Sequence, residues 1–205
     1  MPISSKPEVF IIESLGFADE RKNRFEGQII KQVLALSGKT CEYYYIRTER
    51  ELEKMLRLFT KSGYRYLHLS CHGSESEMAT TLDSLALSRL GELLVPHLES
   101  RRLFVSACGM TNHRLARALW PASKCFSMVG PEENIGFADA AILWASLYHV
   151  LFAEDSSTVA RSVLQAKAQE VADLYRVRLR CFLRSTSERL GYRHVRIRPR
   201  PLAAA

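Results

Sequence analysis

The sequence predicts an α/β fold in which a mostly parallel β-sheet is covered by helices on both faces. Short continuous apolar runs recur along the chain, and the first of them spans residues 9–12. These runs lack the polar alternation of a half-exposed strand, which indicates strands that are covered on both sides. Segments with apolar residues at helical spacing separate the runs, and strands that alternate with helices form parallel sheets through right-handed crossovers.

The first third of the chain contains three predicted strands and two predicted helices. The strands span residues 9–12, 41–46 and 64–70, and the helices span residues 19–36 and 48–61. We expect Asp19 to cap the first helix and Gly38 to end it. Thr48 and Glu51 match a capping box for the second helix, and Gly63 closes that helix.

The rest of the chain continues this alternation. A polar loop is expected at residues 74–80, and a mainly helical segment at residues 82–98. Further strands are predicted at residues 102–107 and 124–129, and further helices at residues 112–119, 137–152 and 157–184. Val195 and Ile197 alternate with arginines, a pattern that fits either an edge strand or an extended tail.

Length and composition indicate one globular domain. The chain has 205 residues, of which 47% are hydrophobic and 25% are charged, and this composition excludes a largely disordered chain. No apolar run approaches the ~20 residues that span a bilayer, and the N-terminus lacks the apolar segment of a signal peptide. The 5 cysteines are widely scattered, which does not fit a disulfide framework. We therefore expect a cytoplasmic protein with no membrane attachment.

Positive charge is concentrated in the last quarter of the chain. From residue 161 onward there are 11 lysines and arginines against 3 acidic residues, a net charge of +8, whereas the first 160 residues have 18 against 19. We therefore predict a domain at residues 1–188 followed by a basic tail at residues 189–205. Such a region can bind nucleic acid or an acidic partner, and a solvated helix face with a tail is the alternative. The candidate nucleic-acid contacts are Arg176, Arg178, Arg180, Arg184, Arg193, Arg196, Arg198 and Arg200.

Two reactive side chains each follow a predicted strand. His72 comes after the strand at residues 64–70, and Cys108 comes after the strand at residues 102–107. Ligands of open parallel sheets bind outside the carboxyl ends of the strands, and adjacent strands lie ~4.8 Å apart. If these strands are neighbours, His72 and Cys108 meet at one edge, and a cysteine beside a histidine is the minimal apparatus for covalent acyl transfer. The alternative is a buried cysteine and an unrelated turn histidine.

A glycine follows each of these reactive residues. Gly73 and Gly109 permit a sharp turn and the close approach of a substrate backbone. The backbone N–H groups of Gly73 and Cys108 are candidate donors to a developing oxyanion, a contribution of roughly 3–4 kcal/mol per donor. The sequence therefore predicts an oxyanion hole at the same edge.

The two strand ends resemble the catalytic strand ends of caspase-like cysteine peptidases (clan CD), and among these they are most similar to the bacterial CHAT branch. The resemblance covers about residues 8–153, and it rests on YLHLSCHG at 66–73, LFVSACG at 103–109, MVGP at 128–131, FADAA at 137–141 and Leu-Tyr at 147–148. It implies a caspase–hemoglobinase fold, which is a three-layer sandwich. It also implies that His72 is the catalytic base and acid and that Cys108 is the nucleophile.

The resemblance implies a cysteine endopeptidase that cleaves a protein substrate through a thioester acyl-enzyme and needs no cofactor. It further implies regulation, here by a separate regulatory or sensor protein because no sensor domain is attached, and a role in bacterial defence. Two alternatives stay open. One is a catalytically silent docking module of the same fold, and the other is binding of nucleic acid or an acidic partner through the basic C-terminal region.

In related peptidases, a charged group in the first specificity pocket selects the substrate side chain. Asp139, Glu132 and Glu133 follow the strand at residues 124–129 and are the candidates for this part. An acidic pocket favours Arg or Lys in the substrate. The alternative is that Glu132 and Glu133 are loop charges and that Asp139 caps the helix at Ala140.

Other polar residues near the strand ends have structural interpretations. Residues 19–24 are expected to start a helix, and Glu13 ends the first strand, where it can line the cleft. Four residues are potential zinc ligands: His68, Cys71, His72 and Cys108. His68 and His72 share one face of a strand and Cys71 points to the other, which makes a single tetrahedral site awkward. No metal site is therefore predicted.

Overall fold

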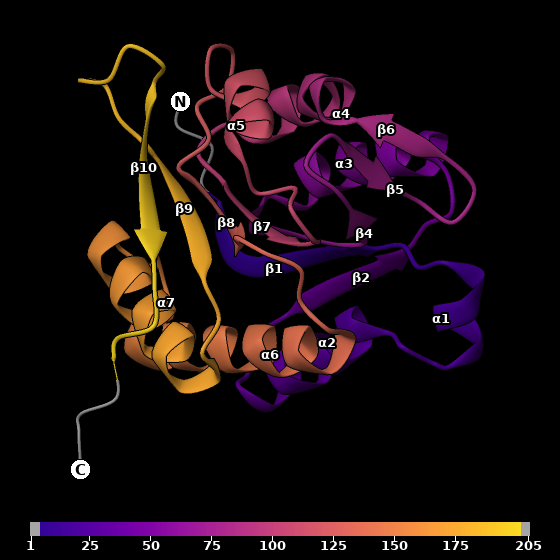
Figure 1. Cartoon of the computed structure of the whole chain (residues 1–205), viewed down its shortest axis with the longest axis horizontal. Coiled ribbons are helices and arrows are strands. Elements are labelled where there is room, and N and C mark those ends of the chain that lie inside the picture. The colour runs from indigo at the N-terminus through magenta and orange to yellow at the C-terminus, as the bar shows by residue number, and fades with distance from the viewer. Residues whose placement is uncertain (1–4, 202–205) are drawn as a thin grey trace.

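Within residues 5–201, which the computed structural model describes, seven strands form one central sheet. The strands are β1 (Lys6–Glu13), β2 (Cys41–Tyr45), β3 (Tyr64–Ser70), β7 (Arg102–Ser106), β8 (Ser127–Pro131), β9 (Leu179–Arg184) and β10 (Tyr192–Ile197). Their order across the sheet is β10-β9-β8-β7-β3-β1-β2 (Figure 1). The pairings from β2 to β8 are parallel, and β9 pairs antiparallel with both β8 and β10. The predicted mostly parallel sheet is therefore confirmed.

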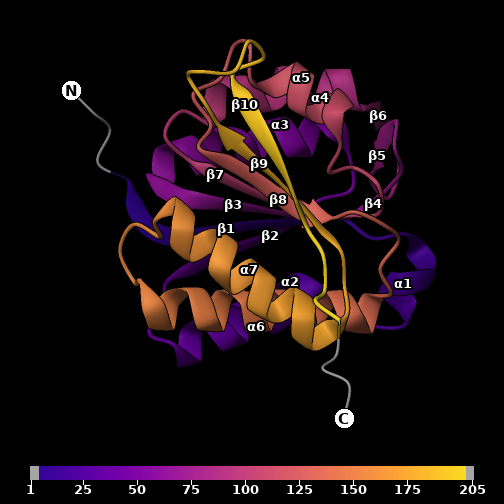
Figure 2. The same ribbon diagram turned by 60° about the vertical axis from the view of Figure 1, so that its left-hand side comes forward.

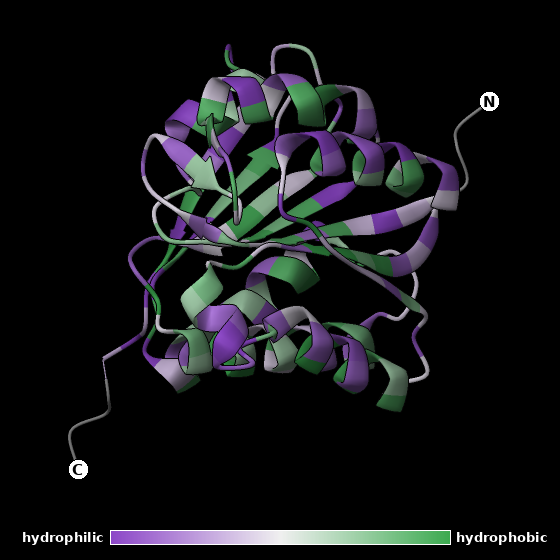
Figure 3. Ribbon diagram, turned by 90° about the vertical axis from the view of Figure 1, so that its right-hand side faces the viewer, coloured by the Kyte–Doolittle hydropathy of each residue, from purple (hydrophilic) through white to green (hydrophobic). Residues whose placement is uncertain are grey.

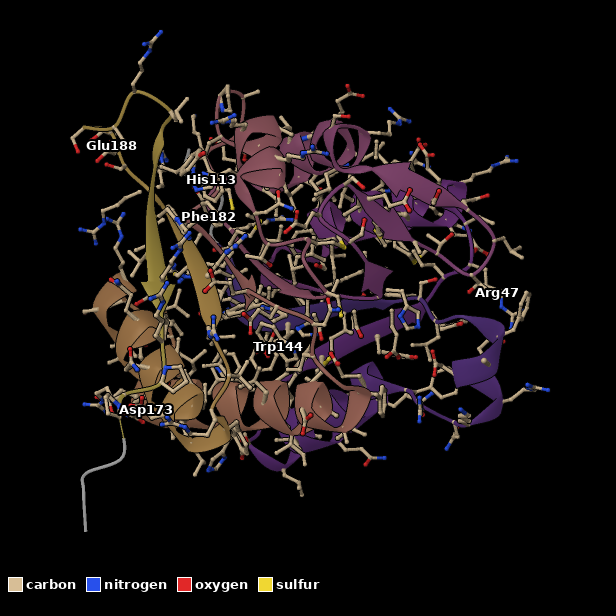
Figure 4. All side chains as sticks on the ribbon, in the orientation of Figure 1. Arg47, His113, Trp144, Asp173, Phe182 and Glu188 are labelled. Carbon is tan, nitrogen blue, oxygen red and sulfur yellow. The ribbon has the colours of Figure 1, made fainter. Side chains whose placement is uncertain are left out.

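Helices cover both faces of this sheet. On one face lie α3 (Glu49–Ser62), α4 (Leu87–Leu94) and α5 (His113–Leu119), and on the other lie α2 (Glu26–Leu36), α6 (Phe137–Glu154) and α7 (Arg161–Tyr175). Figure 3 shows apolar strands between the two helix layers, and Figure 4 shows Trp144 of α6 directed toward the sheet. Phe10 and Ile12 of β1 pack into one core, whereas Val9 and Ile11 pack into the other. The apolar run of β1 therefore supplies two cores, and the three-layer α/β fold is confirmed.

Local sequence signals set the ends of two helices. The Thr48 hydroxyl accepts a hydrogen bond from the Glu51 N–H, and the Glu51 carboxylate accepts one from the Thr48 N–H, which completes the predicted capping box of α3. Gly63 ends α3 with φ 72°, a left-handed conformation that favours glycine. Asn112 caps α5, and its side-chain oxygen accepts hydrogen bonds from two N–H groups of the first turn.

The prediction of one continuous helix at residues 19–36 is wrong. The segment forms α1 (Phe17–Arg21), a turn and then α2. Asn23 takes a left-handed conformation with φ 54°, which interrupts the helical hydrogen bonds. Gly27 lets α2 approach β2 closely, because a Cβ at this position would lie 2.6 Å from the Tyr43 ring. Asp19 consequently lies inside α1 and is not the N-cap of a long helix.

The loop predicted at residues 74–80 contains strands. A small antiparallel sheet consists of β4 (His72–Gly73), β5 (Glu77–Ala79) and β6 (Ser84–Ala86). Met78 and Leu85 are buried in the core beneath α4, and this burial stabilises strands whose other residues are polar and small. The helix predicted at residues 82–98 begins only after β6, as α4 followed by a 3-10 turn at Val95–His97. In Figure 1, α1 and this small sheet lie beyond the same end of the central sheet.

The C-terminal region differs most from the prediction. The helix predicted at residues 157–184 ends at Tyr175, and the next residue, Arg176, has a left-handed conformation with φ 58°. The chain then enters the sheet as β9, and β10 pairs with it as the edge strand (Figure 2). Tyr192 and Ile197 of β10 are buried. The edge-strand alternative is therefore confirmed, and the segment expected to be a basic tail supplies a strand of the sheet.

A buried carboxylate joins the carboxyl end of β1 to its neighbours. Glu13 is fully buried, and its Oε1 accepts a hydrogen bond from the Gly27 N–H at 3.0 Å while its Oε2 accepts one from the Tyr43 hydroxyl at 2.7 Å. The Ser70 hydroxyl lies 3.4 Å from Oε1. These contacts connect β1, α2, β2 and β3 at one end of the sheet. Burial raises the pKa of Glu13 to about 7.

Removal of β10 should destabilise the whole domain. A chain that ends at residue 188 loses the burial of Tyr192 and Ile197, each worth about 1.5–3 kcal/mol, and it exposes the edge of β9. We expect the free energy of unfolding in urea to fall by about 3–6 kcal/mol relative to the full chain. A chain that ends at residue 198 keeps β10 and serves as the control. Equal stability of the two shortened chains would show that β10 is dispensable.

The raised pKa of Glu13 predicts that the free energy of unfolding depends on pH. The folded protein holds a proton on this carboxyl at pH values where the unfolded chain has released it, so stability falls as the pH rises from 4.5 to about 7. Relative to Glu13→Gln, the wild type should lose about 3 kcal/mol of unfolding free energy across this window and lose no more at higher pH. Urea unfolding at a series of pH values measures the difference. A difference that does not change with pH would contradict the assignment.

Candidate active site

The carboxyl ends of β3 and β7 border a pocket. The two strands are parallel neighbours with Ser70 opposite Ser106, so the predicted adjacency is confirmed. His72 and Cys108 follow these ends, and both line a pocket of about 140 Å³. The other lining residues come from the loop after β1, from α1 and α2, from the strand ends and from the start of α6: Leu15, Asp19, Arg24, Glu26, Ser70, Cys71, Ser106, Ala107, Ile135, Phe137 and Ala140. The fold therefore brings the predicted histidine and cysteine to one site.

Cys108 lies at a tight turn after β7. Gly109 has φ 67°, and a Cβ at this position would lie 3.1 Å from the backbone nitrogen of Glu75, so conformation and packing both favour glycine. The Cys108 Sγ lies 3.9 Å from the carbonyl oxygen of Ile135, which belongs to the loop after β8. The side chain is half-buried and accessible from the pocket. The turn thus places the thiol at the carboxyl end of β7, where it borders the pocket.

The other cysteine at this edge has a different environment. Cys71 is buried and packs into the core beneath α3, α4 and α5, where its Sγ lies 3.8 Å from the Sδ of Met110. Burial raises the pKa of the Cys71 thiol. Because the thiolate is the nucleophilic form, Cys108 is the better candidate of the two.

His72 forms a hydrogen bond with an acidic residue that the sequence analysis assigned to a helix start. The His72 Nε2 lies 2.7 Å from the Oδ2 of Asp19, and Asp19 also accepts a hydrogen bond from Arg24 at 3.0 Å. The hydrogen bond from His72, and then that from Arg24, lower the pKa of Asp19, so its carboxylate is ionised. The His72 side chain is 60% exposed, and its Nδ1 is free of this contact. Asp19 therefore orients the imidazole from one side.

The residues of the predicted oxyanion hole lie close together. Gly73 of β4 packs against the side chain of Met110, because a Cβ at Gly73 would lie 2.3 Å from the Met110 Sδ. Met110 is two residues after Cys108, so β4 is held against the turn that carries the thiol. A larger residue at position 73 would require the Met110 side chain to move. The donation of the Gly73 and Cys108 N–H groups to an oxyanion stays a prediction.

Glu26 supplies a buried carboxylate to the same pocket. It is the first residue of α2 and is only 3% exposed. One carboxylate oxygen accepts a hydrogen bond from the Ser106 hydroxyl at 2.8 Å, and the other lies 3.1 Å from the Nε2 of His68. The His68 Nδ1 in turn lies 3.0 Å from the Tyr148 hydroxyl. Glu26 was not among the predicted site residues, because a single acid inside an expected helix carries no signal that distinguishes it from a surface charge.

The acidic residues proposed for a specificity pocket lie elsewhere. Glu132 pairs with Arg180 at 3.3 Å and with Arg196 at 3.5 Å, and Glu133 pairs with Arg178 at 2.9 Å. Asp139 is exposed in the first turn of α6, which begins at Phe137 rather than Ala140. Among the described residues that line the pocket, none of Glu132, Glu133 and Asp139 is present. The carboxylates that the structure brings to the pocket are Asp19 and Glu26.

Several arginines of the basic C-terminal region form ion pairs within the fold. Besides the pairs with Glu132 and Glu133, Arg200 contacts Asp173 at 2.6 Å. The Arg184 carbonyl oxygen accepts a hydrogen bond from Arg161 at 2.7 Å. Much of the positive charge predicted to be available for a partner therefore stabilises the packing of β9, β10 and α7.

The four potential zinc ligands do not form a cluster. His68 is buried on the α2 and α6 side of β3, and Cys71 is buried on the opposite side, as predicted. Across residues 5–201, no group of three or more His, Cys, Asp and Glu side chains is arranged to hold a metal ion. No helix in the same range combines the length and apolar character needed to cross a membrane.

No protein-family model and no curated protein sequence matches the chain. Solved structures of cysteine proteases are nevertheless similar to it. Caspase-1 from Spodoptera frugiperda is similar with a TM-score of 0.55 and 13% identity, over 95% of this chain and 86% of that chain. The secreted C11 cysteine protease iotapain from Bacteroides thetaiotaomicron is similar with a TM-score of 0.53 and 12% identity, over 87% of this chain and 67% of that chain.

A third similar structure is the complex of the RgpB pro- and mature domains from Porphyromonas gingivalis. It has a TM-score of 0.50 and 15% identity, over 73% of this chain and 38% of that chain. Sequence identities this low show a shared fold and leave the chemistry to be argued from the residues. The chain therefore has a caspase-like α/β fold.

Proposed function

We propose that the protein is a cysteine peptidase in which Cys108 is the nucleophile and His72 is the general base and acid. The observation that carries the proposal is that both side chains line one pocket at the carboxyl ends of two adjacent parallel strands. The caspase-like fold, which solved cysteine proteases share, supports it. A cysteine and a histidine at one site provide the groups that covalent acyl transfer requires.

The proposed reaction begins when the Cys108 thiol gives its proton to His72 and the thiolate attacks the carbonyl carbon of a peptide bond. The electron pair of the carbonyl moves to oxygen, where the Gly73 and Cys108 N–H groups are the proposed donors. The C–N bond then breaks as His72 gives the proton to the leaving amine, and a thioester remains. Water attacks the thioester and gives a proton to His72, and the broken C–S bond returns the thiolate.

The substrate of such an enzyme is a protein, and we propose that a regulatory partner or signal controls access to the site. The resemblance to the CHAT branch motivates this regulation and a role in bacterial defence inside the cytoplasm. The RgpB structure is a complex of pro- and mature domains. A silent docking module of the same fold is the competing function, and the first experiment below separates the two.

A thiol-directed peptide electrophile should form one adduct, at Cys108. Wild type and Cys71→Ala are expected to be labelled at similar rates, because the Cys71 side chain is buried in the core, where its Sγ packs against Met110. Cys108→Ala should lose the adduct, and His72→Ala should slow it by roughly 100-fold or more, the usual effect of removing a general base. Intact-mass spectrometry measures each rate. Labelling of Cys108→Ala as strong as that of the wild type would show that the nucleophile is wrongly assigned.

Replacement of Asp19 should weaken the reaction without abolishing it. Asp19→Asn removes the charged acceptor of the His72 hydrogen bond, and we expect the labelling rate to fall roughly tenfold. Because the pKa of Asp19 is lowered, the wild-type advantage should persist at mildly acidic pH and disappear only as the pH falls through that lowered pKa.

Glu20→Gln is the matched control for Asp19→Asn. Glu20 lies on the same short helix but contacts Tyr45 and Arg47 instead of His72. The control variant should keep the wild-type labelling rate and its pH profile. An equal loss in both variants would indicate that α1 matters only as a structural element.

A further inference from the structure

The pocket beside Cys108 is placed to receive one substrate side chain. The carbonyl carbon that a nucleophile attacks belongs to the residue before the cleaved bond, so the side chain of that residue enters the cavity nearest to the sulfur. Cys108 and His72 both border this cavity, whose volume of about 140 Å³ is small. The groups inside it therefore select the residue before the cleaved bond, and this step rests on the proposed function.

The pocket combines apolar walls with a charged inner end. Leu15, Ile135 and Phe137 line its sides. Glu26 is 3% exposed and marks the buried inner end, whereas Asp19 and Arg24 are more exposed and lie toward the mouth. Apolar walls suit a long aliphatic stem, and a carboxylate at the end of such a passage suits a cationic head.

The charges toward the mouth are already paired with one another. Asp19 accepts hydrogen bonds from both Arg24 and His72. Arg24 is the cation that faces the pocket and can oppose a basic substrate side chain, and its contact with Asp19 at 3.0 Å offsets that charge. The net charge that a bound side chain meets in the pocket therefore depends on Glu26 at its inner end.

Among the described residues, no lysine or arginine pairs with the Glu26 carboxylate at the inner end. Its two oxygens contact the Ser106 hydroxyl at 2.8 Å and the Nε2 of His68 at 3.1 Å. The Tyr148 hydroxyl lies 3.0 Å from the other ring nitrogen of His68, and burial raises the pKa of Tyr148, so the phenol keeps its proton. The cationic head of a basic substrate side chain would therefore meet a carboxylate that has no lysine or arginine partner within the fold.

A second carboxylate lies behind the pocket. The Glu13 Oε1 is 3.4 Å from the Ser70 hydroxyl, and Ser70 lines the pocket. After burial, the charge of Glu26 is one of the causes that raise the pKa of Glu13, and a cation at the inner end would oppose this effect. The electrostatic environment therefore favours a positively charged occupant.

We propose that Glu26 is the specificity-determining residue of this pocket and that the enzyme cleaves after Arg or Lys. The aliphatic stem of the substrate residue packs between the apolar walls, and its cationic head pairs with the Glu26 carboxylate. An acidic side chain would meet Glu26 with like charge. An apolar substrate side chain would pack against the apolar walls but leave the Glu26 carboxylate without a cation. This assigns to Glu26 the part that the sequence analysis gave to Asp139, Glu132 and Glu133.

The test uses peptide acyloxymethyl ketones that differ in one residue, the one attached to the ketone. Arginine is compared with citrulline, its neutral isostere, and with leucine and aspartate. We expect the arginine probe to label Cys108 on the order of 10- to 100-fold faster than the citrulline probe, because the neutral urea of citrulline cannot form an ion pair with the Glu26 carboxylate. Iodoacetamide has no side chain for the pocket, so it measures the reactivity of Cys108 itself, and the peptide rates are divided by its rate.

Glu26→Gln should bring the arginine-to-citrulline ratio close to one. Asp139→Asn and Glu133→Gln are matched controls outside the pocket, and they should keep the wild-type ratio. Equal arginine and citrulline rates in the wild type, faster labelling by leucine or aspartate, or loss of the ratio in Asp139→Asn would overturn the assignment. A Cys108 that reacts with no probe, iodoacetamide included, would instead contradict the proposed peptidase function.

A binding measurement keeps the proposal testable if Glu26→Gln fails to fold. Butylguanidinium and butylurea share an aliphatic stem and differ in the charge of the head. Butylguanidinium should raise the Tm of Cys108→Ala more than butylurea does at the same concentration. Equal shifts for the two compounds would show that the pocket does not recognise a cation.

Discussion

The parallel pairing of β3 with β7 is the contact on which the rest of the site depends. Ser70 lies opposite Ser106, so both strands leave the sheet at the same level. Side chains alternate along a strand, and the last residues of β3 and β7 point to the same face, because the Ser70 hydroxyl contacts Glu13 and the Ser106 hydroxyl contacts Glu26. A slip of one residue in this pairing would place His72 and Cys108, each two residues after these serines, at different levels of the sheet edge. Register thus decides whether the two reactive groups share a pocket.

Buried carboxylates at this end of the sheet oppose stability. Glu13 and Glu26 are almost inaccessible to solvent, and their mutual repulsion adds to the cost of removing them from water. Farther along the same face of the sheet, the contacts with α6 are apolar and aromatic, as with Phe104 and Trp144. The hydrogen bonds to Gly27, Ser106 and other donors reduce the cost without removing it. Buried charge is therefore found at the end of the sheet where the pocket opens, and apolar packing along the rest of this face.

The C-terminal hairpin contributes to the site through the loop that follows β8. Arg180 of β9 and Arg196 of β10 both contact Glu132, the first residue after β8. Three residues later, the Ile135 carbonyl oxygen lies 3.9 Å from the Cys108 Sγ, and Ile135 lines the pocket. The basic strands therefore hold the start of a loop that forms one wall. Their positive charge is explained in part by this packing, without a nucleic-acid partner.

Local patterns were sufficient to predict the strands β1, β3 and β7 and the capping box at Thr48, because periodicity and turn chemistry depend on neighbouring residues. They were also sufficient to place His72 and Cys108 just after two strands, and the structure brings both residues to one pocket. They were insufficient for β9 and β10, because the arginines that alternate there resemble a helix face or a tail until a sheet edge is present to pair with them. They also could not find Asp19 and Glu26, which lie 53 residues from His72 and 80 from Ser106 along the chain. Contacts at such separations arise from the packing of whole helices and strands. Only the three-dimensional structure therefore shows that Asp19 and Glu26, which the sequence placed in an expected helix, line the pocket.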